Sequence, residues 1–263
     1  MKQVILALTI LIAGWTGAAN ARDTVVRDDL TAIFDAHGVQ GTFALLDVTS
    51  DRLVLVGAQR AGQGFIPAST FKIANSLIAL ESARIVDENE IIPYGGAPQP
   101  IEAWEQDMSL RDAFRVSNVP VFQTLARRVG HAEYVDYLAR LDFGNGQVGD
   151  DVTSFWLSGP LEISAVDYTG FLARLARGDL PISKRSQSIV RDIARLEQRG
   201  DATLYGKTGW TIAPDPDIGW FVGWVERNDA LHSFALNIDM KSRDDASKRE
   251  DIAKALLVAL GVF

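Results

Sequence analysis

Ser69 and Lys72 form the pair of residues whose types and spacing are best suited to nucleophilic catalysis. Ser69 is the only serine that is followed by a lysine three residues later, and side chains at that spacing share one face of a helix. The surrounding run is apolar almost all round, which predicts a buried helix over 69–80. Burial disfavours the charged amine and lowers its pKa, so the neutral amine can accept the serine proton. The alternative is a lysine that extends to solvent from a surface helix.

Two later stretches, Ser117-Asn118-Val119 and Lys207-Thr208-Gly209, change the balance between these alternatives. The first lies between two helical patterns, and the second ends a predicted strand. Ser-x-x-Lys, Ser-Asp-Asn and Lys-Thr-Gly, in that order, are typical of penicillin-recognising serine enzymes. Here the second element is Ser-Asn-Val. Singly, Ser117 could be a helix cap and Lys207 a solvated strand end, but their joint occurrence favours a catalytic site.

The composition excludes several other kinds of site. The chain of 263 residues has no cysteine, which excludes disulfide scaffolds, thiol nucleophiles and thiolate metal sites. Its histidines, His37, His131 and His232, are too far apart for a metal-ligand spacing, so no metal is expected. No Gly-x-Ser-x-Gly motif occurs, although a Ser-His-Asp triad stays open because triads assemble in space. A net charge of -8 without a basic cluster argues against nucleic-acid binding.

Residues 1–21 are predicted to be a secretory signal peptide. Lys2 is followed by a short apolar run over 4–15 and by Ala19-Asn20-Ala21, which resembles a cleavage site. The run is shorter than the roughly 20 residues that span a bilayer, and a retained membrane anchor is the alternative. We expect cleavage after Ala21 and a periplasmic mature chain without a membrane span.

Hydrophobic periodicity predicts strands at both ends of the chain and helices between them. Strand patterns occupy 41–48, 52–57, 202–208, 218–225 and 233–239. Helical patterns occupy 69–80, 109–114, 119–129, 132–141, 165–177, 186–195 and 246–260. The predicted fold class is α+β, with a mostly antiparallel sheet from both termini and an inserted helical lobe. We expect a single domain over 22–263, with a sheet lobe at about 22–65 and 200–263 and a helical lobe at about 66–199.

The chain resembles the class D, oxacillinase-type, serine β-lactamases, which share the penicillin-binding-like fold. The matching segments span nearly the whole mature chain and are 67–72 (Pro-Ala-Ser-Thr-Phe-Lys), 117–119, 143–145 (Phe-Gly-Asn), 156–164 (Trp-Leu-x-Gly-Pro-Leu-x-Ile-Ser), 207–210 (Lys-Thr-Gly-Trp) and 234–239 (Phe-Ala-Leu-Asn-Ile-Asp). Class A is disfavoured, because its second element is Ser-Asp-Asn and no counterpart of its catalytic glutamate is found. Phe143 stands where many relatives carry tyrosine, and we expect the variant to be tolerated.

The resemblance implies a hydrolase that opens the β-lactam amide bond of penicillin-type antibiotics and confers antibiotic resistance. Ser69 is the implied nucleophile. Lys72, converted by carbon dioxide to N6-carboxylysine, is the implied general base for acylation and deacylation. Val119 and Trp156 are expected to line the lysine pocket, where the Trp156 indole N–H donates to the carbamate. No metal or organic cofactor is implied.

The resemblance also implies the groups that bind the β-lactam. Ser117, assisted by Lys207, would relay a proton to the leaving nitrogen, and the backbone N–H groups of Ser69 and Trp210 would bind the oxyanion. The implied substrate-binding residues are Lys207, Thr208, Gly209, Trp210 and Arg249, with Arg243 as a rival to Arg249. A β-lactam sensor that is acylated without turnover and a D,D-peptidase are the alternative functions. The sequence leaves open the preferred lactams, which depend on loops near 94–104 and 212–217, and the oligomeric state.

Overall fold

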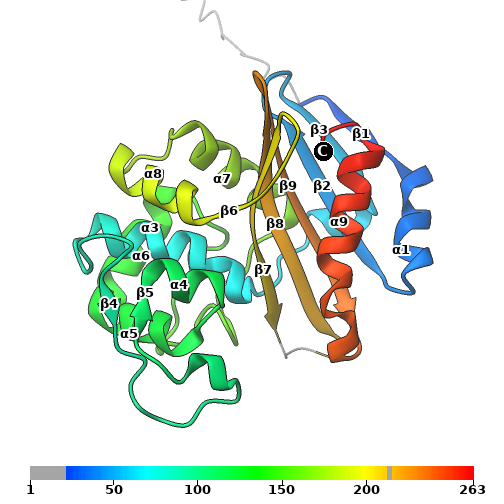
Figure 1. Ribbon diagram of the computed structural model, residues 1–263. Coiled ribbons are helices and arrows are strands. Elements are labelled where there is room, and N and C mark those ends of the chain that lie inside the picture. The colour runs from blue at the N-terminus through cyan, green and yellow to red at the C-terminus, as the bar shows by residue number, and fades with distance from the viewer. Residues whose placement is uncertain (1–21, 212–214) are drawn as a thin grey trace, which may run out of the picture.

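The computed structural model describes residues 22–211 and 215–263, and the predicted signal peptide at 1–21 lies outside this part. Its centre is a seven-stranded sheet in the order β1-β3-β2-β9-β8-β7-β6 (Figure 1). These strands are β1 (Thr24–Val26), β2 (Gly41–Asp47), β3 (Arg52–Val56), β6 (Arg195–Arg199), β7 (Ala202–Thr211), β8 (Asp217–Arg227) and β9 (Ala230–Met240). Neighbouring strands are antiparallel except for β1 with β3. The predicted α+β class, with a mostly antiparallel sheet from both chain ends, is confirmed.

Helices come mainly from the middle of the chain. They are α1 (Ala32–Ala36), α2 (Ala58–Ala61), α3 (Lys72–Glu81), α4 (Leu110–Arg115), α5 (Val119–Val129), α6 (His131–Leu141), α7 (Ala165–Arg177), α8 (Lys184–Ile193) and α9 (Lys248–Ala259). The 3-10 turns of the described residues are η1 (Asp28–Thr31), η2 (Ala68–Phe71), η3 (Glu102–Trp104) and η4 (Arg243–Ala246), and β4 (Ile91–Ile92) pairs with β5 (Met108–Ser109).

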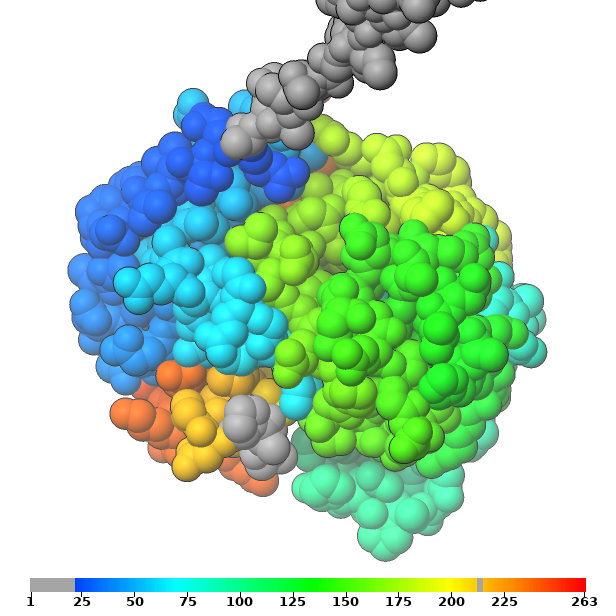
Figure 2. Space-filling model, turned by 180° about the vertical axis from the view of Figure 1, so that it is seen from behind, coloured from blue at the N-terminus to red at the C-terminus, as the bar shows by residue number. Residues whose placement is uncertain are grey.

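The sheet separates two hydrophobic cores. Helices α1 and α9 cover one face, and the helices of the middle of the chain cover the other (Figure 1). Successive side chains of a strand point to opposite faces, so Trp220 of β8 joins the core under the helical lobe while Phe221 joins the core under α9. Seen from behind, the blue N-terminal part of the chain lies on one side of the molecule and the green middle part on the other (Figure 2). The candidate site lies where strand β7 of the sheet meets η2 and the helical lobe.

One prediction about local structure was wrong at its end, and a second was right except for the type of its first turn. The helix predicted over 186–195 ends at Ile193, and Arg195 begins the edge strand β6. Leu196 in that strand is 51% exposed, so β6 lacks the alternation of buried and exposed residues that identifies a strand. The helix predicted over 69–80 begins with the 3-10 turn η2 and becomes α-helical at Lys72. In a 3-10 turn the side chains at i and i+3 eclipse, which brings Ser69 and Lys72 even more directly together.

Candidate active site

Ser69 lies in η2, at the N-terminal end of the central helix α3. The preceding Ala68 has a φ of +49°, a left-handed conformation that is uncommon for a residue with a Cβ. Hydrogen bonds hold this turn in place: the Thr70 hydroxyl donates to the Pro67 carbonyl at 2.5 Å, and the Tyr168 hydroxyl of α7 donates to Thr70 Oγ1 at 2.8 Å. The turn that presents the Ser69 hydroxyl is therefore fixed by α7 as well as by its own backbone.

Lys72 is completely buried, and its Nζ donates to Ser69 Oγ at 2.8 Å. Burial holds the pKa of this amine well below its usual range, and repulsion by the charge of Lys207 lowers it further. Both effects act against the protonated form, so they favour a neutral amine beside the serine. The alternative of a lysine extending to solvent is wrong.

Aromatic side chains are concentrated in the core around the turn that carries Ser69 and Lys72. The Phe122 ring of α5 lies 5.2 Å from Lys72 Nζ, one turn after the half-buried Val119 that begins this helix. Phe71 stacks on Trp156 with ring centroids 5.6 Å apart and an interplanar angle of 29°. The buried Trp156 Nε1 has no hydrogen-bond partner among the described residues. A buried N–H without a partner costs free energy, so this donor is available to an acceptor that enters the pocket.

Phe71 and Phe122 are contributors that the sequence reading passed over. The sequence patterns gave neither residue a role at the site, although Phe122 is three residues from Val119 and so shares its face of α5. Phe143 joins the same region: it is buried, and its ring packs edge-on against Phe71 at 5.6 Å and Phe171 at 4.9 Å. A phenyl ring fits this apolar cluster without requiring a hydrogen-bond partner.

Ser117 lies between α4 and α5 and has a φ of +58°, so its backbone is also left-handed. The neighbouring Asn118 holds this connection, because its side chain accepts a hydrogen bond from Val121 N and donates one to the Trp104 carbonyl. The Ser117 side chain is half-buried and forms no hydrogen bond with other described residues. Its hydroxyl is free to exchange a proton with a bound ligand.

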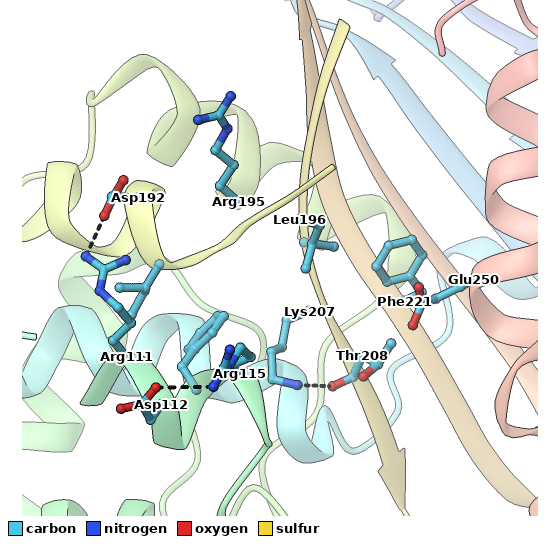
Figure 3. Close-up of a pocket in the computed structure, with 13 residues that line it drawn as sticks. Arg111, Asp112, Arg115, Asp192, Arg195, Leu196, Lys207, Thr208, Phe221 and Glu250 are labelled. Atoms are coloured by element: carbon cyan, nitrogen blue, oxygen red, sulfur yellow. Dashed lines mark hydrogen bonds and ion pairs between the residues drawn. The ribbon is translucent and has the colours of Figure 1, made fainter. Parts of the chain in front are cut away.

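Strand β7 carries Lys207 and Thr208 beside the Ser69 turn. A Cβ added at Gly209 would lie 2.9 Å from the Pro67 carbonyl oxygen and 3.1 Å from Thr70 N, so the strand and the turn are in direct backbone contact. Lys207 is buried, sits 5.8 Å from the Phe114 ring centroid and donates from Nζ to the Thr208 carbonyl at 3.3 Å (Figure 3). Burial, with repulsion by Arg249, lowers the pKa of Lys207 to about 8.

Arg249 and Trp210 complete the site on the side of α9. Arg249 Nη1 donates to the Gly209 carbonyl at 2.6 Å, and its side chain crosses Gly219, where a Cβ would lie 2.8 Å from Arg249 Cδ. The half-buried Trp210 donates from Nε1 to Asp217 at 2.8 Å. Arg243, the rival cation, lies exposed in η4 and forms no side-chain bond with the described residues. The geometry favours Arg249 as the cation at this end of β7.

The part of the chain that the structure describes has neither a metal-binding cluster nor a membrane-spanning helix. Within 22–211 and 215–263, no group of three or more histidine, cysteine, aspartate or glutamate side chains could hold a metal ion. In the same part of the chain, no helix is long and apolar enough to cross a bilayer.

This arrangement defines a penicillin-recognising serine protein. Residues 41–258 match the family model of the penicillin binding protein transpeptidase domain. The chain is 37% identical over 258 residues to β-lactamase OXA-48 of Klebsiella pneumoniae, covering 98% of this chain and 97% of that protein. It is 33% identical to β-lactamase OXA-10 of Pseudomonas aeruginosa, covering 98% of each. The class D β-lactamase YbXI from Nostoc superposes with a TM-score of 0.87 at 38% identity, over 90% of this chain and 100% of that one. The chain belongs to the class D β-lactamases, which are hydrolases of the β-lactam amide bond.

Proposed function

We propose that this chain hydrolyses penicillin-type β-lactams through an acyl-enzyme on Ser69, with an N-carboxylated Lys72 as general base, and so confers antibiotic resistance. The observation that carries the proposal is the buried Lys72 amine, 2.8 Å from Ser69 Oγ. The buried Trp156 indole N–H, which has no partner among the described residues, is proposed to face the same pocket. A neutral amine adds to carbon dioxide and loses one proton, which yields a carbamate anion. The unpartnered indole N–H suits such an anion, and Val119 would line the same pocket.

When carboxylated, Lys72 supplies an anionic oxygen base for both acylation and deacylation. Ser69 Oγ attacks the lactam carbonyl carbon, and the backbone N–H groups of Ser69 and Trp210 receive the oxyanion as it forms. Ser117, which has a free hydroxyl, passes a proton to the ring nitrogen as the C–N bond breaks, and the charge of Lys207 assists it. Water then attacks the ester carbonyl and releases the product from Ser69.

In this proposal the substrate is bound by residues at the end of β7 and on α9, which are Lys207, Thr208, Gly209, Trp210 and Arg249. A guanidinium forms two parallel hydrogen bonds with a carboxylate, so Arg249 suits the carboxylate that β-lactams carry. The contact between Arg249 and the Gly209 carbonyl supports this role, because it holds the cation at the strand end beside Thr208. The overall charge of -8 makes such local cations necessary for an anionic substrate.

The proposal is tested by hydrolysis of a chromogenic cephalosporin and a penicillin, with and without bicarbonate. We expect steady turnover that rises with bicarbonate, disappears in Lys72→Ala and persists in the control Lys241→Ala, which removes an exposed lysine. Mass spectrometry should detect an acyl adduct on the wild type and none on Ser69→Ala. A single burst of acylation without turnover, even in bicarbonate, would reject the hydrolase mechanism and favour the sensor.

We further propose that residues 1–21 direct export to the periplasm and are removed there. The support is the sequence pattern of a positive start, a short apolar run and Ala19-Asn20-Ala21. N-terminal sequencing of the exported protein should begin at Arg22. A form that retains Met1 and stays with the membrane fraction would contradict cleavage.

A further inference from the structure

A cavity of about 300 Å³ extends the site along the edge of β7. Strand β6 pairs with β7 only as far as Tyr205, so from Lys207 onward β7 pairs with one strand only, β8, and its other edge faces the Ser69 turn. The cavity begins at this unpaired edge and reaches both faces of the sheet. Figure 3 shows Arg111 and Arg115 on the side of the helical lobe, and Glu250 and Phe221 on the side of α9.

The charges on the helical side of the cavity are matched by partners. Arg111 forms ion pairs with Glu88 and with Asp192, the latter at 2.6 Å. Arg115 lies 3.5 Å from Asp112, and Arg195 donates to the Gln198 side chain at 2.7 Å. The charges of Arg111 and Arg115 are therefore compensated by carboxylates before any ligand enters, whereas Arg195 has a neutral amide as its partner.

The charges on the α9 side are arranged differently. Glu250, in the first turn of α9, is half-buried and forms neither an ion pair nor a side-chain hydrogen bond with the described residues. It lines the cavity together with Lys207 and Thr208, and it follows Arg249 in the chain. Burial lowers the pKa of both Lys207 and Arg249, and the negative charge of Glu250 partly offsets this lowering, as expected for a carboxylate close to these cations. Phe221 and the half-exposed Leu196 supply apolar surface next to it.

We propose that Glu250 is a specificity-determining residue, which selects β-lactams carrying a cationic substituent on the leaving-group side over purely anionic ones. This inference rests on the proposed function, because it assumes that the substrate carboxylate binds at Lys207, Thr208 and Arg249. A carboxylate placed there meets the repulsion of Glu250. A cation on the same ring would lie in the adjoining cavity and would be attracted by Glu250 instead. The apolar surface of Leu196 and Phe221 suits the carbon skeleton that carries such a cation.

The experiment compares kcat/KM for benzylpenicillin, a monoanion, with kcat/KM for a cephalosporin that bears a quaternary ammonium group at C3. In Glu250→Gln we expect kcat/KM for benzylpenicillin to rise about fivefold, since one screened negative charge is removed near the carboxylate. For the cephalosporin, kcat/KM should stay unchanged or fall. The ratio of kcat/KM for benzylpenicillin to kcat/KM for the cephalosporin should therefore rise by about fivefold or more. The shift should shrink at about 0.5 M salt, where the Debye length is only a few ångström.

Asp251→Asn is the matched control, because it removes the same charge from the next residue of α9, which is exposed and does not line the cavity. Its preference should change by less than about twofold. An unchanged preference in Glu250→Gln, or an equal shift in Asp251→Asn, would overturn the inference. If neither substrate is turned over, the proposed function fails, and the rates of Ser69 acylation by the two ligands still give the preference that tests Glu250.

Discussion

Replacing Trp156 with phenylalanine should make the enzyme dependent on added bicarbonate. The substitution removes the indole N–H and keeps an aromatic ring against Phe71, which stacks on Trp156 at 5.6 Å. Because Trp156 Nε1 has no partner among the described residues, its loss breaks no hydrogen bond in the uncarboxylated protein. The substitution should therefore act selectively on the carboxylated state of Lys72.

The size of the effect follows from the strength of one buried hydrogen bond. A hydrogen bond to a charged group contributes about 1.5–3 kcal/mol, which corresponds to about a 10- to 150-fold change in an equilibrium constant. The bicarbonate concentration that gives half-maximal turnover should rise by this factor in Trp156→Phe. The smaller ring also leaves space in the core, so we expect a stability loss of about 1–3 kcal/mol.

The assay titrates bicarbonate against the steady-state rate after careful removal of dissolved carbon dioxide. Trp224→Phe controls for general destabilisation, because Trp224 is also fully buried but stacks on Tyr205 at 4.8 Å and donates its indole N–H to Glu226 at 3.1 Å. It should lower stability, measured by chemical denaturation, without changing the bicarbonate requirement. The reasoning would be refuted if Trp156→Phe needed no more bicarbonate than the wild type, or if Trp224→Phe needed equally more.

Three further predictions concern the strand β7 and its surroundings. Lys207 is cationic below its pKa of about 8 and neutral above it, so kcat/KM for an anionic penicillin should fall as the pH rises through this value. Lys207→Arg should keep kcat/KM high to a more alkaline pH, because a guanidinium stays charged there. A flat wild-type profile to about pH 10 would contradict this prediction. Gly209→Ala should lower activity about 100-fold, because its Cβ would push β7 away from the turn that carries Ser69. In the control Gly170→Ala, in α7, the new Cβ meets no atom within 4 Å, and the protein should be stabilised by about 0.5–1 kcal/mol. Equal activities of the two variants would refute the close contact at Gly209. Arg249→Ala should lower kcat/KM for penicillins about 10- to 100-fold, while Arg243→Ala should change it less than twofold. A larger loss in Arg243→Ala than in Arg249→Ala would show that Arg243 binds the substrate carboxylate instead.

The local elements with regular periodicity were predictable from the sequence. The ranges 119–129 and 165–177 coincide with α5 and α7, because both helices bury one continuous face and end at glycine. Strand β6 was not predictable, since its residues are mostly exposed on both faces and its strand conformation comes from pairing with β7. The 3-10 conformation of the turn at Ser69 was also not predictable, because hydrophobic periodicity does not distinguish a single 3-10 turn from the first turn of an α-helix.

The sequence by itself determined that Ser69 and Lys72 share one side of a helical turn, because a spacing of three residues decides this wherever the turn lies. The order of the three motifs likewise indicated the family. Only the tertiary structure decided that Lys72 is buried against Phe122, that Phe71 stacks on Trp156, that Gly209 touches the Ser69 turn, and that Arg249 instead of Arg243 reaches β7. These contacts join segments far apart in the chain, so they depend on how the sheet and helices pack. Because the same packing desolvates Lys72, it lowers the pKa of the amine and gives the Ser-x-x-Lys spacing its proposed chemistry.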